Sequence, residues 1–385
     1  MKHTSAPFLT LAASLVGYLL PLTAYAAVPP SPSTGCVPTG KLEIHYINVG
    51  QGGATLIIGQ DGTKILFDFG GVPGNNDIVP YLKDIAQLKP EDGIQYTMVS
   101  HRDRDHYVGY KDVVAAGYDV LIANYNSGST KITTMMKNNW LGPAKKTKAG
   151  AVKTIPIGMR IPLGECAEAV VMAANGVVLG EKKTGPKKLD ENDRSISLFV
   201  RHGKFSYIID GDLGSGPEKC TKHETGQQDV QTRVAKALLS QKLMDEEHGV
   251  DVLHIAHHGS ESSTSAAYYN IMKPEVGLVS VGQKNSTYMH PRADVVDKIL
   301  LGDKRADCVT APALKALFQT EDGEKGCLKT GCTSFSGLAM GDIKLVTDGL
   351  TDYTVTGNDR VHGGDKESDQ SPTRTWSFKL DEVNQ

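Results

Sequence analysis

The feature that most constrains the fold is a series of short apolar runs, each followed directly by a loop that carries Asp or His. The runs "KILFDFG", "IQYTMVS", "KFSYIIDGDL" and "DVLHIAHHGS" are rich in aliphatic and aromatic residues and are typical of strands. Between them lie segments with helical spacing, such as 78–88 behind the candidate cap Asn76. This alternation predicts an α/β domain whose polar side chains gather where strands end.

Other segments extend the same pattern. Helices are expected over 109–117, 230–244 and 293–301, and strands over "DVLIANY", "SISLFVR" and "EVGLVSVG". Residues 131–188 show less regular patterning. They hold 11 Lys or Arg against three Glu, in a chain of net charge −3. Such an excess could attract a polyanion such as nucleic acid or teichoic acid, but the lysines lack interleaved aromatic residues, so we favour solvated surface loops.

The N-terminus has the pattern of a secretory signal peptide over residues 1–26. A basic start precedes an apolar stretch over 8–20, and the small residues Ala24 and Ala26 predict cleavage before Ala27. A membrane anchor is less favoured, since a spanning helix needs roughly 20 apolar residues. A Pro/Ser-rich linker is expected over 27–40.

Six cysteines follow the expected signal peptide, where an oxidising compartment would favour disulfides. Cys327 and Cys332 are close enough in sequence to close a small loop, and the other pairings stay open. No further hydrophobic span is expected, and no protein partner is inferred.

The stretch "SHRDRDHYVG" holds four candidate metal ligands: His101, Asp103, Asp105 and His106. Imidazole nitrogen and carboxylate oxygen suit Zn²⁺, Mn²⁺ or Fe²⁺, whereas a calcium loop would not use histidine. Asp212 and His257 follow later strands, and for each taken alone a turn or capping role is favoured. Their recurrence at strand ends favours a shared metal site.

The order of the motifs "INVGQGGATLI", "ILFDFGG", "SHRDRDHYVG", "NDRSISL", "IIDGDL", "AHHGS" and "SVGQKNSTYMHP" resembles the metallo-β-lactamase fold, specifically the hydrolase domain of ComEC-type competence proteins. The resemblance covers roughly residues 42–302. It implies a four-layered αβ/βα sandwich with a two-metal site at the sheet edges. We therefore expect a metallo-β-lactamase-like hydrolase domain over 41–307 and a C-terminal extension with short strands and cysteine-bearing loops over 308–385.

The resemblance also implies roles for individual residues. His101 and Asp103 would hold one metal; Asp105, His106 and His257 would hold the other; Asp212 would bridge them, and Asp68 would orient the ligand loop. Asn192 and Asp103 stand where the broader superfamily more often has histidine, which makes Mn²⁺ plausible beside Zn²⁺. His258 and His290 are candidates to contact or protonate the leaving group, and Asn192 to bind a non-bridging oxygen; for these three a structural role is an equal alternative.

The expected function is that of a secreted metal-dependent phosphodiesterase or nuclease, with Asp105 also orienting the nucleophile and with DNA as a candidate substrate. One alternative is a hydrolase of a lactone, β-lactam or other carbonyl ester on the same fold. The other is a non-catalytic module that binds a polyanion.

Overall fold

The computed structural model describes Met1 and residues 36–71, 78–128, 132–181, 188–283, 287–301, 305–329, 331–358 and 373–380. The expected signal peptide beyond Met1, the linker up to residue 35 and the candidate cap Asn76 lie outside the described residues.

The first sheet is mixed, and among the described residues it has nine strands. Antiparallel pairing joins β1 to β2 and β18, whereas β3, β4, β5 and β6 run parallel. In spatial order the strands are β20 (Arg374–Lys379), β19 (Asp352–Gly357), β18 (Ile343–Thr347), β1 (Leu42–Tyr46), β2 (Thr55–Ile58), β3 (Lys64–Phe67), β4 (Ile94–Val99), β5 (Val120–Asn126) and β6 (Lys153–Thr154).

The second sheet also has nine strands within the described part of the chain. Strands β11 to β14 run parallel, and β10 pairs antiparallel with β11 and β8. In spatial order they are β17 (Leu338–Ala339), β14 (Ala316–Gln319), β13 (Val276–Val279), β12 (Val252–His254), β11 (Phe205–Ile209), β10 (Ser197–His202), β8 (Ala167–Ala174) and β7 (Arg160–Pro162), with β9 (Val177–Val178) paired to β8. A separate hairpin joins β15 (Cys327–Leu328) and β16 (Gly331–Cys332).

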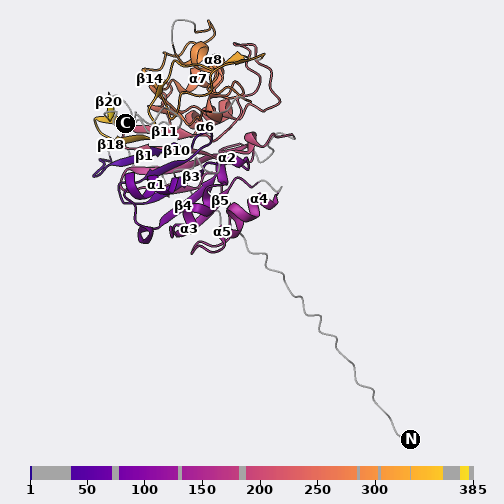
Figure 1. Cartoon of the computed structure of the whole chain (residues 1–385), viewed down its shortest axis with the longest axis vertical. Helices are drawn as coiled ribbons and strands as arrows, with labels where there is room; N and C mark the ends of the chain where they lie inside the picture. The colour runs from indigo at the N-terminus through magenta and orange to yellow at the C-terminus, as the bar shows by residue number, and fades with distance from the viewer. Residues whose placement is uncertain are drawn as a thin grey trace.

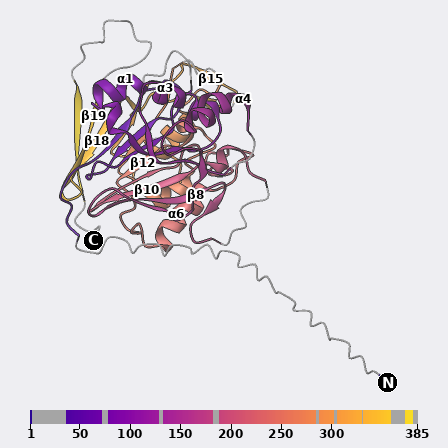
Figure 2. The same cartoon turned by 90° about the horizontal axis from the view of Figure 1, so that it is seen from below.

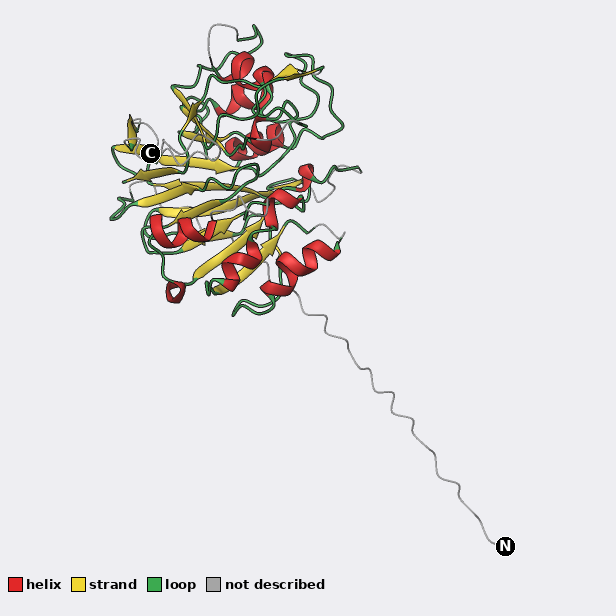
Figure 3. Cartoon of the chain, viewed as in Figure 1, coloured by secondary structure: helices red, strands yellow, loops and turns green. Residues whose placement is uncertain are grey.

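Helices cover the outer faces of both sheets, as Figures 1 and 3 show. Beside the first sheet lie α1 (Ile78–Pro80), continued by a π-helical turn over Tyr81–Ile85, then α2 (Arg104–Tyr107), α3 (Tyr110–Ala115), α4 (Thr134–Met136), a π-helical turn over Lys137–Leu141 and α5 (Gly142–Ala144). Beside the second lie α6 (Gln231–Ser240), α7 (Ala266–Met272) and α8 (Ala293–Val295), continued over Val296–Leu300. Short 3₁₀ turns span Pro90–Asp92, Asn192–Arg194 and His257–Gly259. Among the described residues, no helix has the length and apolar character needed to cross a membrane.

Three apolar cores separate these layers, because successive residues of a strand point to opposite faces of its sheet. Phe67 and Leu198 lie in the core between the two sheets. Their neighbours Leu66 and Phe199 point outward, each into a core shared with the helices on its own side. The sequence of helices, sheet, sheet and helices confirms the expected αβ/βα sandwich.

The solvated surface loops favoured for residues 131–188 do not account for the whole segment, because it contains the buried strand β8. All eight residues of β8, "AEAVVMAA", are buried. A strand covered on both faces lacks the alternating pattern that identifies strands in sequence, and alanine and glutamate favour strands weakly. The buried Glu168 accepts hydrogen bonds from Arg160 and Arg201, which satisfies its charge.

The helix expected over 230–244 ends earlier. Helix α6 stops at Ser240, and Lys242 has a φ of 55°, in the left-handed region that commonly follows a helix. Leu243 and Met244 are nevertheless buried, as their apolar character suggested.

Strands from beyond residue 308 belong to both sheets. β14 and β17 continue the second sheet, and β18 pairs with β1 in the first. Figure 2 shows β18 and β19, in yellow, along one side of the molecule. The short strands expected in the C-terminal extension therefore complete the two sheets, while the expected boundary at residue 307 stays a prediction.

All six cysteines are paired, as Cys36–Cys166, Cys220–Cys308 and Cys327–Cys332. The last pair is the small loop expected from the sequence. Cys36–Cys166 ties the segment before β1, in the first sheet, to the residue before β8, in the second.

We predict that replacing Cys36 and Cys166 together by serine lowers the free energy of unfolding by about 2–5 kcal/mol, because this disulfide closes a long loop in the unfolded chain. The sequence separation is 130 residues, against 5 for Cys327–Cys332. Chemical denaturation would measure both effects, with the double serine variant of Cys327 and Cys332 as the matched control. A larger loss in the control than in the Cys36 and Cys166 variant would contradict the prediction.

Candidate functional site

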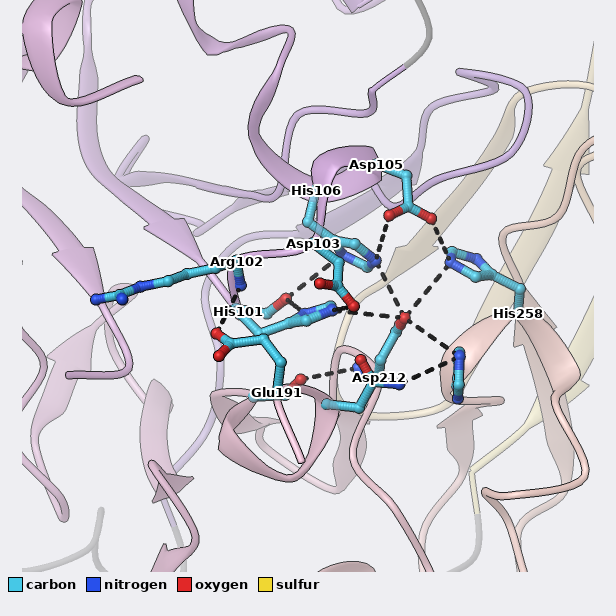
Figure 4. A network of polar contacts seen from close by, with 12 residues as sticks. His101, Arg102, Asp103, Asp105, His106, Glu191, Asp212 and His258 are labelled. Carbon is cyan, nitrogen blue, oxygen red and sulfur yellow. Dashed lines mark hydrogen bonds and ion pairs between the residues drawn. The ribbon is translucent and has the colours of Figure 1, made fainter. Parts of the chain in front are cut away.

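The loop after β4 brings four of the expected ligands to one edge of the first sheet (Figure 4). His101 is buried in this loop, and Asp105 and His106 belong to the first turn of α2. Asp103 precedes the helix with extended backbone, at φ −73° and ψ 147°, and its side chain is about half exposed. The turn into α2 therefore separates Asp103, on the rim, from the buried His106.

Asp68 holds this loop from behind. It follows β3, and its Oδ1 accepts a hydrogen bond from the backbone N–H of Ser100 at 2.7 Å. Its Oδ2 accepts one from Ser100 Oγ at 2.7 Å and lies 2.8 Å from Nδ1 of His106. Because Nδ1 is engaged, His106 presents Nε2 to the centre of the site. A carboxylate in this position fixes both the tautomer and the orientation of a metal-binding imidazole.

Gly71 permits the close approach of the chain after β3 to helix α2. A Cβ atom built on Gly71 would lie 2.2 Å from Cα of Asp105, far inside any possible contact. The second glycine of "FDFGG" is therefore required to place Asp105 and His106 beside Asp68.

Asp212 occupies the middle of the site, at the end of β11 in the second sheet. Its Oδ2 lies 3.2 Å from Nε2 of His106, and 3.7 Å from Nε2 of both His101 and His258. Nε2 of His257 is 3.9 Å away. Figure 4 shows these contacts converging on the one carboxylate, which is 3% exposed. This position between two groups of ligands is the one expected of a bridging carboxylate.

Two groups of potential ligands share His106 among the described residues. His101, His106 and Asp212 form the first group; Asp105, His106 and His258 form the second, and in each group the ligand atoms lie within 4.8 Å of one another. Asp103 is beside the first group, with Oδ2 3.5 Å from Nε2 of His101.

The places of His257 and His258 differ from those expected. Nε2 of His258 lies 3.4 Å from Oδ2 of Asp105, so His258 belongs to the second group. Nε2 of His257 lies instead 3.4 Å from Nδ2 of Asn192. The cause is local backbone geometry: both histidines have left-handed φ values, 52° and 56°, and their ring planes diverge by 68°. In the structure His258, rather than the expected His257, therefore lies beside Asp105.

The inward-facing nitrogens fit a cation. Nε2 of His101, His106 and His258 are buried and have no hydrogen-bond partner among the described residues. Buried polar atoms almost always have a hydrogen-bond partner or a bound ion. Three such nitrogens around two carboxylates therefore indicate a site for a cation. Imidazole nitrogen with carboxylate oxygen is a donor set that suits Zn²⁺ and Mn²⁺.

Charges within the site stabilise one another. Burial alone would raise the pKa of Asp212, but the surrounding imidazoles of His106, His258 and His257 hold this pKa well below its usual range. Burial lowers the pKa of His106, yet Asp212, Asp68 and Asp105 together raise it well above the ordinary value. The two aspartates of the centre, Asp105 and Asp212, are therefore ionised at neutral pH.

A cleft of about 820 Å³ opens over this centre, lined by Asp105, Asp212 and His258. Asn192 and His290 line it as well. The ring centroid of His290 lies 5.6 Å from that of His257 and 6.1 Å from that of His258. Burial is the largest influence on His290 and holds its pKa well below the ordinary value. The structure thus brings every expected site residue to the cleft or its base, with Asp68 behind the ligand loop.

Four contributing residues were not singled out from the sequence. Ser100 links Asp68 to both His101 and His106, and Ser262 lies 3.0 Å from Nδ1 of His257. Tyr288 and Arg292 line the cleft on either side of His290. Ser100 directly precedes His101, so adjacency to the ligand motif was a usable signal for it. Nothing in the sequence distinguished the other three.

No protein-family model matches the chain. Its sequence is 23% identical to Recombination protein 2 of Haemophilus influenzae over 262 residues, which cover 67% of this chain and 26% of that protein. It is 22% identical to ComE operon protein 3 of Bacillus subtilis over 273 residues, which cover 66% of this chain and 30% of that protein. A shorter match, 28% identical over 113 residues, covers 29% of this chain and 14% of Competence protein ComA of Neisseria gonorrhoeae.

The chain thus spans between a quarter and a third of the length of the first two relatives. These similarities confirm the resemblance to competence proteins that the order of motifs predicted.

Several solved structures are similar to the chain, including two whose names refer to metallo-beta-lactamase. The metallo-beta-lactamase fold protein YhfI from Bacillus subtilis has a TM-score of 0.37 and 10% identity, covering 62% of this chain and 85% of that one. The MIM-2 metallo-beta-lactamase has a TM-score of 0.32 and 19% identity, and the match covers 58% of this chain and 79% of that one. The layers of this chain itself agree with the predicted metallo-β-lactamase-like fold.

We predict that Asp68→Asn weakens binding of Zn²⁺ and Mn²⁺ by roughly 10–100-fold, because the amide cannot accept both the Ser100 and the His106 hydrogen bonds. Isothermal titration calorimetry on the chelator-treated protein would measure the affinities. Asp112→Asn, at an exposed position of α3, is the matched control and keeps the parental affinity. Equal affinities in the two variants would contradict the orienting role of Asp68.

Proposed function

We propose that this protein is a secreted, metal-dependent phosphodiesterase, with DNA as its leading substrate. The observation that carries the proposal is the convergence of three buried imidazole nitrogens, which make no hydrogen bond among the described residues, and two aspartates at the base of an open cleft. An open site that combines such donors is suited to hydrolysis.

Two divalent cations, Zn²⁺ or Mn²⁺, fit this donor set. His101 and Asp103 would hold one, Asp105, His106 and His258 the other, with Asp212 between them. When bound, a pair of such ions lowers the pKa of a water molecule and stabilises the charge that develops on the attacking and leaving oxygens. Nε2 of His257 lies 3.9 Å from Oδ2 of Asp212 and 3.4 Å from Nδ2 of Asn192. By the resemblance, Asn192 stands where the broader superfamily more often has histidine.

Side chains around this centre provide the remaining chemistry. Asp105 is about a third exposed, so its carboxylate accepts a hydrogen bond from an attacking water and orients it. Asn192 has an amide that can donate to a non-bridging oxygen of the substrate, and His290 lines the cleft where its ring can donate to the leaving oxygen. We assign His258, which the sequence suggested for the leaving group, as a ligand instead, because it lies in the second group of potential ligands.

A phosphodiester is favoured over a carbonyl ester for two reasons. Its non-bridging oxygens share a negative charge that adjacent cations would neutralise. One relative is named for recombination, a process of DNA, and another for competence, and these names support a nucleic acid as the substrate.

Secretion is supported by the cysteines. All six form disulfides, and structural disulfides persist in oxidising compartments outside the cytosol. The signal-peptide pattern over 1–26 points to the same destination.

We predict that the protein from Ala27 onward hydrolyses single- or double-stranded DNA when supplied with Mn²⁺ or Zn²⁺. Asp105→Asn should reduce the rate by at least about 10²-fold, since it removes a ligand and the acceptor that orients the nucleophile. Gel electrophoresis of labelled oligonucleotides would measure the rates, with Asp112→Asn as the control for an unrelated aspartate.

Chelation should abolish the activity, and added Mn²⁺ or Zn²⁺ should restore it. Assays with a lactone and a β-lactam, run beside the DNA assay, distinguish hydrolysis of a carbonyl centre from hydrolysis of a phosphodiester. Turnover of either carbonyl substrate without any cleavage of DNA or of a small phosphodiester would overturn the proposal. DNA binding that survives Asp105→Asn without hydrolysis by the parent protein would favour a polyanion-binding module.

A further inference from the structure

A row of three nearly parallel rings leads from the candidate metal centre to the mouth of the cleft. The planes of His258 and His290 differ by 28°, with centroids 6.1 Å apart. Those of His290 and Tyr288 differ by 23°, with centroids 5.6 Å apart. Both distances fall in the range of offset-stacked aromatic pairs. The row begins at a ligand of the second group and ends at an exposed tyrosine.

Tyr288 is unusually exposed for a side chain so close to a functional site. It is 59% exposed, whereas His290 and His258 are 3% and 4% exposed. One face of its ring lies against His290, so most of its exposed area belongs to the opposite face and the ring edge. Tyr288 also lines the cleft. The exposed face of the Tyr288 ring is therefore a flat apolar surface that a ligand in the outer part of the cleft can contact.

The backbone that carries Tyr288 is held in place. Nη1 of Arg292 donates a hydrogen bond to the carbonyl oxygen of Tyr288 at 3.1 Å, and the Arg292 side chain is 1% exposed. Nε of Arg292 lies 3.2 Å from Oε2 of Glu261, which fixes the guanidinium. Met289 has a φ of 56°, a left-handed conformation that is costly for such a residue and that clusters at ligand-binding sites. Because the backbone that carries the Tyr288 ring is already fixed, binding of a ligand to this ring costs little conformational entropy.

The cleft is also larger than the metal centre needs. Its volume of about 820 Å³ lies in the range of sites that enclose a small organic molecule. Leu328, on the disulfide-closed hairpin of β15 and β16, adds a second exposed apolar side chain to its wall. A substrate that fills this space has a flat apolar part beside the group that reacts at the ions.

We propose that Tyr288 is the platform on which a heteroaromatic base of the substrate stacks, beside the phosphodiester that reacts. The inference rests on the proposed function and narrows its substrate class to nucleotides. Stacking of a base on an aromatic side chain depends little on base identity, because every base has a π-face. Tyr288 is thus a specificity-determining residue that selects nucleotide phosphodiesters over aliphatic ones.

The test measures binding rather than turnover. 2-Aminopurine 2′-deoxyriboside 5′-monophosphate is titrated with the full chain supplied with Zn²⁺, and the fluorescence of the base reports stacking. We expect quenching on binding to the parent protein, and an affinity lower by about tenfold or more in Tyr288→Leu, from the usual contribution of one stacked base. Tyr288→Phe keeps the ring and should keep the quenching and the affinity to within about threefold.

Phe335→Leu serves as the matched control, since Phe335 is an exposed ring, 49% accessible, that does not line the cleft. Thermal melting verifies that all variants are folded, as expected for exposed positions. Equal affinity and quenching in the parent and Tyr288→Leu, or no binding to the parent, overturns the inference. If the protein cleaves no phosphodiester, the proposed function fails, and the binding result still decides whether Tyr288 stacks a base.

Discussion

The carboxylate of Asp212 is the point on which the arrangement of both halves depends. A buried carboxylate is costly unless positive groups surround it, and here imidazoles reach it from both sheets. The two sheets must therefore pack with the end of β4 facing the end of β11. Backbone contacts fix the same register: Ile196, before β10, donates a hydrogen bond to the carbonyl oxygen of Ser100. Gly211 lies so close to Ser100 that a Cβ atom there would come within 2.7 Å of the Ser100 Cβ.

From this contact the rest of the site follows. Asp68 and Ser100 form a rigid base on the first sheet, and the loop of His257 and His258 closes the second side. The loop of Tyr288, His290 and Arg292 then makes one wall of the cleft. The Cys327–Cys332 hairpin supports that wall through the bridge between Arg292 and Thr333. Disulfides and buried hydrogen bonds thus hold an open cleft over a charged centre.

Much of this arrangement was accessible from the sequence, because its signals are local. A strand that ends in a loop rich in histidine and aspartate is recognisable from a short stretch of sequence. The loop carrying His101 and His106 follows a strand, as the pattern predicted, and so does Asp212. The exchange of His257 and His258 was not accessible, since it depends on two consecutive left-handed residues without glycine at either position. Strand β8 was not predicted, because a strand buried on both faces lacks the alternation of apolar and polar residues. The pairing of β18 with β1 joins segments about 300 residues apart, and no local pattern specifies such a partner.

We propose that one cleft holds two cations, on either side of Asp212. Anomalous diffraction at the zinc absorption edge, from crystals of the protein grown with Zn²⁺, tests it most directly. We expect two anomalous peaks, one beside His101 and Asp212 and one beside Asp105 and His258. A single peak, no peak, or a second ion bound by His257 in place of His258 would contradict it.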